Sequence, residues 1–273
     1  MKESETPVAI LPLEIDAVEA FRPQAELRLN FAKAIQRKTG EPLSLTLFKY
    51  TDIYRRLGLG EPPKDVRGPE DLHPVWNALV REIEEATDSA KTFIDRALQI
   101  RRESGHTFSD EGERRVGMFT YSILKEAKPP MVDIHVSPLK QQRNERMSPT
   151  LLYKDMVEVF RRIKEEYPES ADSNEHVVVR GSTWLYRDNM ESLYRFLFPD
   201  SYVNSKQERK TGFDGGGRWG QFIDQQGNFK ANLAAELLNN VERYDVDKLY
   251  KAFPNPTYTF EAPIVDFYAK YGL

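Results

Sequence analysis

The segment that most constrains the fold is a strand, a helix and a second strand in succession between residues 131 and 183. Residues 131–136 (MVDIHV) alternate apolar and polar side chains, as a half-buried strand does. Ser148 and Pro149 favour a helix start, and apolar residues then recur at helical spacing. Residues 176–180 (HVVVR) predict a second, buried strand. A helical connection between two strands is typical of a crossover unit whose strands are parallel.

The first half of the chain is mostly helical in pattern. Residues 75–102 keep an apolar residue at every third or fourth position, which predicts one long packed helix. Residues 111–128 predict a further helix. Residues 43–50 (LSLTLFKY) fit a short strand, residues 51–60 (TDIYRRLGLG) could equally begin another helix, and the pattern leaves this region ambiguous.

These patterns predict an α+β or mixed α/β fold, with a helical N-terminal half packed with a small mixed sheet in the C-terminal half. We expect residues 131–136, 176–180 and 219–224 (WGQFID) to form the sheet. The prolines at 129 and 130 mark the change of character. We therefore expect a mostly helical region over residues 1–128 and an α/β region over residues 129–273, with one continuous domain as the alternative.

Composition narrows the class of protein. A formal net charge of −4 argues against broad binding to nucleic acid, which requires a basic face. The chain contains no cysteine, which excludes disulfides, thiolate chemistry and cysteine-based zinc sites. No apolar run reaches the roughly 18 residues of a membrane span. The first residues lack the long apolar core of a signal peptide, and we expect a cytoplasmic protein.

The second strand runs directly into Arg180, Gly181, Ser182 and Thr183. Polar turns at strand ends are the places where open α/β sheets bind ligands. Arg180 can hold a carboxylate or phosphate through two hydrogen bonds, and Ser182 and Thr183 add hydroxyls. The alternative is structural, with Arg180 in an ion pair and the two hydroxyls in a turn.

A glycine cluster follows, with five of the chain's 15 glycines between residues 212 and 220. Gly215-x-Gly217-x-x-Gly220 matches the dinucleotide fingerprint in letters, but a basic loop precedes it and WGQFID follows it. The preferred functional hypothesis is an anion-binding lid that uses glycine amides and Arg218, with Trp219 and Gln221 beside the ligand. The alternative is a loop without a binding role.

Three residues near these segments are candidates for proton transfer: His135, His176 and Asp224. Asp133, His135 and His176 also contain the residue types of a two-histidine, one-carboxylate iron site. Arg180-x-Ser182 resembles the carboxylate-binding R-x-S motif of 2-oxoglutarate oxygenases. That family has His-x-Asp where this chain has Asp-x-His, so our prediction for the site contains no metal.

Two further motifs resemble GNAT-type N-acyltransferases. Arg114-x-x-Gly117, followed by the MVDIHV strand, resembles the coenzyme A loop of that family, and IVDFYAKYGL is similar to a helix and turn near the family's C-terminal end. The resemblance implies a helix after residue 117 whose backbone amides hold the pyrophosphate of coenzyme A. Phe119 stands where the family has glycine or alanine.

The leading hypothesis is an enzyme or binding protein for a small anionic ligand that carries a phosphate or carboxylate. Its pocket would lie between residues 180–183 and 212–221, with Arg180 and Arg218 on the anion. The sequence leaves open whether the protein is an enzyme and which cofactor it uses. The rival hypothesis is a non-catalytic interaction module whose long helices bind a protein partner.

Overall fold

The computed structural model divides the chain into two compact units, and each has its own hydrophobic core. The first comprises Met1–Ser109 and Ala234–Val246, and the second comprises Asp110–Leu233 and Asp247–Leu273. The structure describes residues 21–57, 59, 62–104, 114–136, 148–172, 176–213, 216–224 and 227–273. The sheet belongs to the second unit and the first unit is helical where described, so the predicted α+β class is confirmed.

The first unit is built from helices packed around buried Leu29, Trp76 and Phe93. Its elements are α2 (Arg22–Thr39), α3 (Leu43–Tyr50), α4 (Ile53–Arg56), η1 (Pro69–Asp71), α5 (Pro74–Glu85) and α6 (Ser89–Ser104). Most of α11 (Ala231–Val241) also belongs to this unit. Lys38 of α2 donates hydrogen bonds to the carbonyls of Glu242 and Tyr244, both at 2.9 Å, just beyond the end of α11.

The structure decides one region of this unit that the sequence left ambiguous and corrects one prediction. LSLTLFKY, which fitted a short strand, is helical, as α3. The long helix predicted over residues 75–102 is two helices, because Ala86 has an extended backbone and α6 begins anew at Ser89. Asp88 accepts a hydrogen bond from the Lys91 amide at 2.9 Å, which satisfies a free donor in the first turn of α6.

The second unit contains a six-stranded sheet in the order β1-β2-β3-β4-β6-β5. The strands are β1 (Arg114–Val116), β2 (Phe119–Leu124), β3 (Met131–Val136), β4 (Val178–Thr183), β5 (Gln207–Glu208) and β6 (Tyr258–Pro263). Only β3 and β4 pair in parallel among these strands, and α7 (Pro149–Glu166) connects them. The predicted parallel crossover is therefore confirmed.

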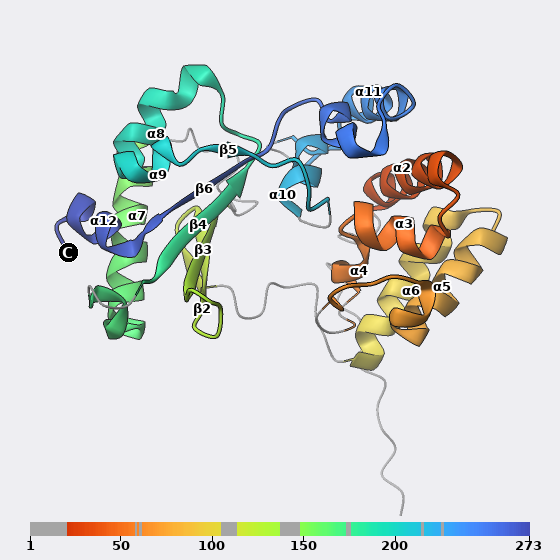
Figure 1. Ribbon diagram of the computed structural model, residues 1–273, viewed down its shortest axis with the longest axis horizontal. Helices are drawn as coiled ribbons and strands as arrows, with labels where there is room; N and C mark the ends of the chain where they lie inside the picture. The colour runs from red at the N-terminus through yellow and green to blue at the C-terminus, as the bar shows by residue number, and fades with distance from the viewer. Residues whose placement is uncertain are drawn as a thin grey trace, which may run out of the picture. The chain divides into compact units, whose positions relative to one another are not determined.

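Helices α7, α8 (Glu191–Leu197), α9 (Asp200–Asn204) and α12 (Ile264–Tyr271) lie together on one face of the sheet (Figure 1). Val132 and Val179 point to this face, where Phe160 and Phe267 stack with ring centroids 4.6 Å apart. Shorter helical segments complete the unit: η2 (Pro168–Ala171), η3 (Asp188–Met190), α10 (Gly216–Trp219), η4 (Gly220–Phe222) and η5 (Val246–Ala252).

Two further predictions are wrong. The helix predicted over residues 111–128 is instead the hairpin of β1 and β2, whose turn contains Gly117 with φ of 53°. A side chain at Gly117 would also collide with the Asp155 carboxylate of α7. The WGQFID segment is helical, as α10 and η4, and only Ile223 makes an isolated bridge, to Phe229. The strand that pairs with the other edge of β4 is β6.

Candidate functional site

The parallel strands β3 and β4 separate before they end. Their ladder stops at the pair Ile134 and Gly181, although β3 continues to Val136 and β4 to Thr183. Each strand keeps its other neighbour, since Val136 pairs with Phe119 of β2 and Thr183 pairs with Tyr258 of β6. We call the gap between residues 135–136 and residues 182–183 the wedge.

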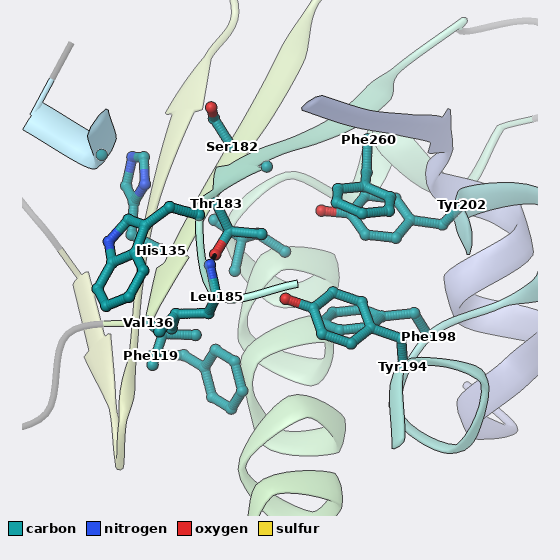
Figure 2. Close-up of a pocket in the computed structure, with 14 residues that line it drawn as sticks. Phe119, His135, Val136, Ser182, Thr183, Leu185, Tyr194, Phe198, Tyr202 and Phe260 are labelled. Atoms are coloured by element: carbon teal, nitrogen blue, oxygen red, sulfur yellow. Dashed lines mark hydrogen bonds between the residues drawn. The ribbon is translucent and has the colours of Figure 1, made fainter. Parts of the chain in front are cut away.

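A cavity of about 130 Å³ occupies the wedge (Figure 2). Its inner walls are mostly aromatic and aliphatic, and polar groups from both strands and from α8 and α9 reach it. The lining residues are Phe119, Ile134, His135, Val136, Gly181, Ser182, Thr183, Trp184, Leu185, Tyr194, Phe198, Tyr202, Gly217 and Phe260. An apolar cavity with a few converging polar groups is the usual form of a small-ligand site.

Gly181 has a structural reason to be glycine. A Cβ at this position would lie 2.3 Å from the Tyr202 hydroxyl oxygen and 3.5 Å from the Ile134 carbonyl oxygen. Any side chain would therefore displace Tyr202 from the inner end of the wedge. The close approach places a tyrosine hydroxyl at the point where the β3–β4 ladder ends.

Tyr194 and Tyr202 both supply protonated hydroxyls at neutral pH. Burial raises the pKa of Tyr194 to about 12, and a hydrogen bond with the Thr183 side chain opposes this rise. Burial, with smaller contributions from Tyr194 and Asp133, also raises the pKa of Tyr202 well above its usual value. In Figure 2 both hydroxyls point toward β4 and the segment that follows it.

A polar cluster lies where Asp133 of β3 pairs with Arg180 of β4. An Arg180 Nη2 atom lies 3.4 Å from Asp133 Oδ2, and His135 Nε2 lies 3.7 Å from the same oxygen. The ion pair considered for Arg180 is therefore present. The His135 side chain is 44% exposed and lines the cavity, so its imidazole is accessible to a ligand.

The wedge brings together three of the predicted site residues: His135, Ser182 and Thr183. Ser182 Oγ accepts a hydrogen bond from Arg209 Nη1 at 3.5 Å, and Thr183 Oγ1 accepts one from the Leu185 amide at 2.9 Å. Arg180 lies one residue before the point of separation, outside the described residues that line the cavity.

Arg218, Trp219 and Gln221 have structural surroundings instead. The buried Arg218 guanidinium lies over Phe213 and Phe253, and its Nη2 donates to the Arg209 carbonyl at 2.5 Å. Burial, with the nearby Arg209, lowers the pKa of Arg218 to about 10.

The side chains next to it are equally enclosed. Trp219 donates to the Phe213 carbonyl at 2.8 Å, and Gln221 exchanges hydrogen bonds with Asn255. From the glycine cluster, Gly217 reaches the cavity, while residues 214 and 215 lie outside the described residues. All three side chains thus contact the surrounding protein, and the buried Nε and Nη1 of Arg218 have no hydrogen-bond partner among the described residues.

His176 and Asp224 are not part of the wedge. His176 precedes β4 at the end opposite to the separation, so it does not join Asp133 and His135 in an iron site. Asp224 accepts hydrogen bonds from the amide and side chain of Asn228 and shapes a turn. Among the described residues no group of three or more histidines and carboxylates could hold a metal ion.

Tyr194, Tyr202 and Phe260 were not predicted as site residues. Tyr194 lies in an amphipathic helix, where its spacing indicates a core position and nothing more. Phe260 belongs to β6 (Tyr258–Pro263), a strand that the sequence pattern did not reveal. Gly181 was the available signal, since an isolated glycine inside a strand pattern suggests a close backbone approach.

The chain was compared with protein-family models, curated proteins and solved structures. No family model, no curated protein and no solved structure matches this chain. Within the described part of the chain, every helix is too short or too polar to cross a membrane.

Proposed function

We propose that this protein is an N-acyltransferase that binds the thioester arm of a coenzyme A-type donor in the wedge. The observation that carries the proposal is the separation of β3 and β4 after Ile134 and Gly181, with a narrow cavity between them. Where two strand edges face each other without hydrogen bonds between them, their backbone N–H and C=O groups can bind a ligand. An extended arm that contains amides and ends in an acyl thioester has matching groups along its length.

The start of α7 supports a donor that carries phosphates. The Asp155 carboxylate, in the second turn of α7, accepts a hydrogen bond from the Met118 amide at 3.3 Å. Met118 adjoins Phe119, which pairs with Val136, so α7 begins at the wedge end of β3. The first turn of α7 has no acidic residue and is exposed. Free amides at a helix N-terminus favour phosphate groups.

The proposal keeps the phosphate-bearing ligand predicted from the sequence but moves its location. Arg180 is engaged by Asp133, and Arg218 is buried against Phe213 and Phe253, so neither is placed as a primary anion ligand. The resemblance to GNAT-type N-acyltransferases also needs correction. Arg114 and Gly117 lie in a hairpin and strand β2 follows them directly, so these residues are not proposed to hold coenzyme A.

The proposed reaction joins an amine to the acyl group. The amine nitrogen attacks the thioester carbonyl carbon, a C–N bond forms, and the C–S bond breaks to release a thiolate. His135 would accept the proton that the amine loses and then pass it to the thiolate. The products are an amide and a free thiol. A cytoplasmic location, predicted from the sequence, is part of this proposal.

Calorimetric titration of acetyl-coenzyme A tests the proposal with a matched pair of variants. Val136 and Leu124 are exposed strand residues, 41% and 42% accessible, but Val136 lines the cavity and Leu124 pairs with Met131 at the far end of β3. We expect Val136→Trp to weaken binding at least about tenfold, because an indole would fill the wedge. We expect Leu124→Trp to bind like the unmodified protein.

Two results would reject the proposal. One is an unmodified protein that binds neither acetyl-coenzyme A nor coenzyme A, which would favour the alternative of a non-catalytic module with a protein partner. The other is equal binding by the Val136→Trp and Leu124→Trp variants, which would place the ligand elsewhere.

A further inference from the structure

Tyr202 has an uncommon position for a polar side chain. The residue is 5% exposed, and its ring packs against Phe260 and Phe198 with centroids 5.3 and 5.0 Å away. Its hydroxyl oxygen lies against Gly181 at the inner end of the wedge. The aromatic neighbours hold the ring, and therefore the hydroxyl, in one orientation.

This hydroxyl makes no hydrogen bond with any of the described residues. The oxygen is not among the fully buried polar atoms that lack a partner, because it faces the cavity, where a ligand can supply one. Tyr202 lines the cavity, and Figure 2 shows its oxygen directed toward β4. Tyr194, the other tyrosine of the cavity, already bonds to Thr183. Tyr202 is thus a donor available to a ligand.

We infer that the Tyr202 hydroxyl donates a hydrogen bond to the acyl carbonyl oxygen of the donor. This inference rests on the proposed function, because it assigns the innermost group of the same ligand. An arm that enters at the ends of β3 and β4 has its terminal group deepest, where the ladder closes at Ile134 and Gly181. The terminal group of an acyl donor is its thioester, and the carbonyl oxygen is a hydrogen-bond acceptor.

The raised pKa of Tyr202 is consistent with this role, since the phenol stays protonated at neutral pH. Gly181 is part of the same arrangement, because a side chain there would displace the hydroxyl. The site would therefore distinguish an acyl thioester from a donor of the same shape that lacks the carbonyl oxygen.

Calorimetry with three probes tests this inference: acetyl-coenzyme A, coenzyme A and S-ethyl-coenzyme A, a thioether without the carbonyl oxygen. We expect the unmodified protein to prefer acetyl-coenzyme A over the thioether by about two- to tenfold, the range for one neutral hydrogen bond. Tyr202→Phe retains the ring and should abolish this preference while leaving coenzyme A binding unchanged. The control is Tyr271→Phe, which removes a buried hydroxyl that bonds to the Leu197 carbonyl outside the cavity.

The outcomes separate the inference from the proposed function. A preference that persists in Tyr202→Phe, or that is absent from the unmodified protein, would overturn the inference while coenzyme A binding still supports the function. Equal weakening of all three probes by Tyr202→Phe would also overturn it, because the hydroxyl would then bind the arm and not the acyl group. If none of the probes binds, the proposed function fails and the inference fails with it.

Discussion

Arg28 and Asp52 form an ion pair that is almost completely withdrawn from water in the first unit. Their side chains are 1% and 3% exposed, and Arg28 also donates to the Gln24 carbonyl at 3.0 Å. Removing one partner of a buried pair leaves the other charge without compensation. Substitution of either residue is therefore expected to destabilise the first unit.

We predict that Asp52→Asn lowers the free energy of unfolding by about 3–5 kcal/mol, measured by urea denaturation. The control is Asp95→Asn, which breaks an exposed pair with Lys91 and should change stability little, because water screens such pairs. Equal effects of the two substitutions would mean that burial does not determine the contribution of the Arg28–Asp52 pair.

At the level of single residues, the sequence indicated the strand end at residues 180–183 but not its partners. Ser182 and Thr183 were predicted because hydroxyls follow a run of valines, and they do reach the cavity. Tyr202 was not, because its contact with Gly181 joins residues from two elements. The burial of Arg218 was not predicted, since local composition cannot distinguish a buried guanidinium from one that faces a ligand.

Among the secondary-structure elements, α6 depends on a carboxylate at its start. Asp88 accepts a hydrogen bond from the Lys91 amide, which lowers the pKa of the Asp88 carboxyl, and the nearby Arg22 adds to the effect. A pKa that is lower in the folded state stabilises the fold above the unfolded pKa, about 3.9 for aspartate. That stabilisation is lost as the pH falls through the folded-state value.

We therefore predict that Asp88→Asn is less stable than the unmodified protein near neutral pH, and that the difference narrows below about pH 4. Urea midpoints measured across this range give the comparison. A difference that stays constant down to about pH 2 would show that the ionised carboxylate does not stabilise α6.

A helix or strand could be predicted where its apolar residues recur regularly over enough positions. The β3–α7–β4 unit could be predicted because its alternating and helical patterns are long and its boundaries contain Ser148 and Pro149. WGQFID was assigned to a strand because the aromatic spacing in six residues fits a strand and a helix equally well. In the fold, Trp219 and Phe222 both pack against Phe253, and this packing favours the helical conformation. β6 was not predicted, because its pairing with β4 over six residues joins distant parts of the chain and leaves no local sequence pattern.

For the whole molecule, contacts in the fold divide the chain differently from the change in sequence pattern at residue 129. The hairpin of β1 and β2 precedes that point but pairs with β3, so it belongs to the second unit. Residues 234–246 follow it but belong to the first unit, where Lys38 holds their end. A boundary in the pattern marks where the kind of element changes, not where long-range contacts are made.

The most direct test of the wedge as a ligand site is hydrogen–deuterium exchange with and without saturating acetyl-coenzyme A. Exchange reports where backbone amides become protected, and the proposed ligand bonds to backbone groups of β3 and β4. We predict slower exchange in peptides that cover residues 131–136 and 178–185, and unchanged exchange in peptides from α2. Unchanged exchange in both strands, or protection confined to the first unit, would contradict a ligand site between β3 and β4.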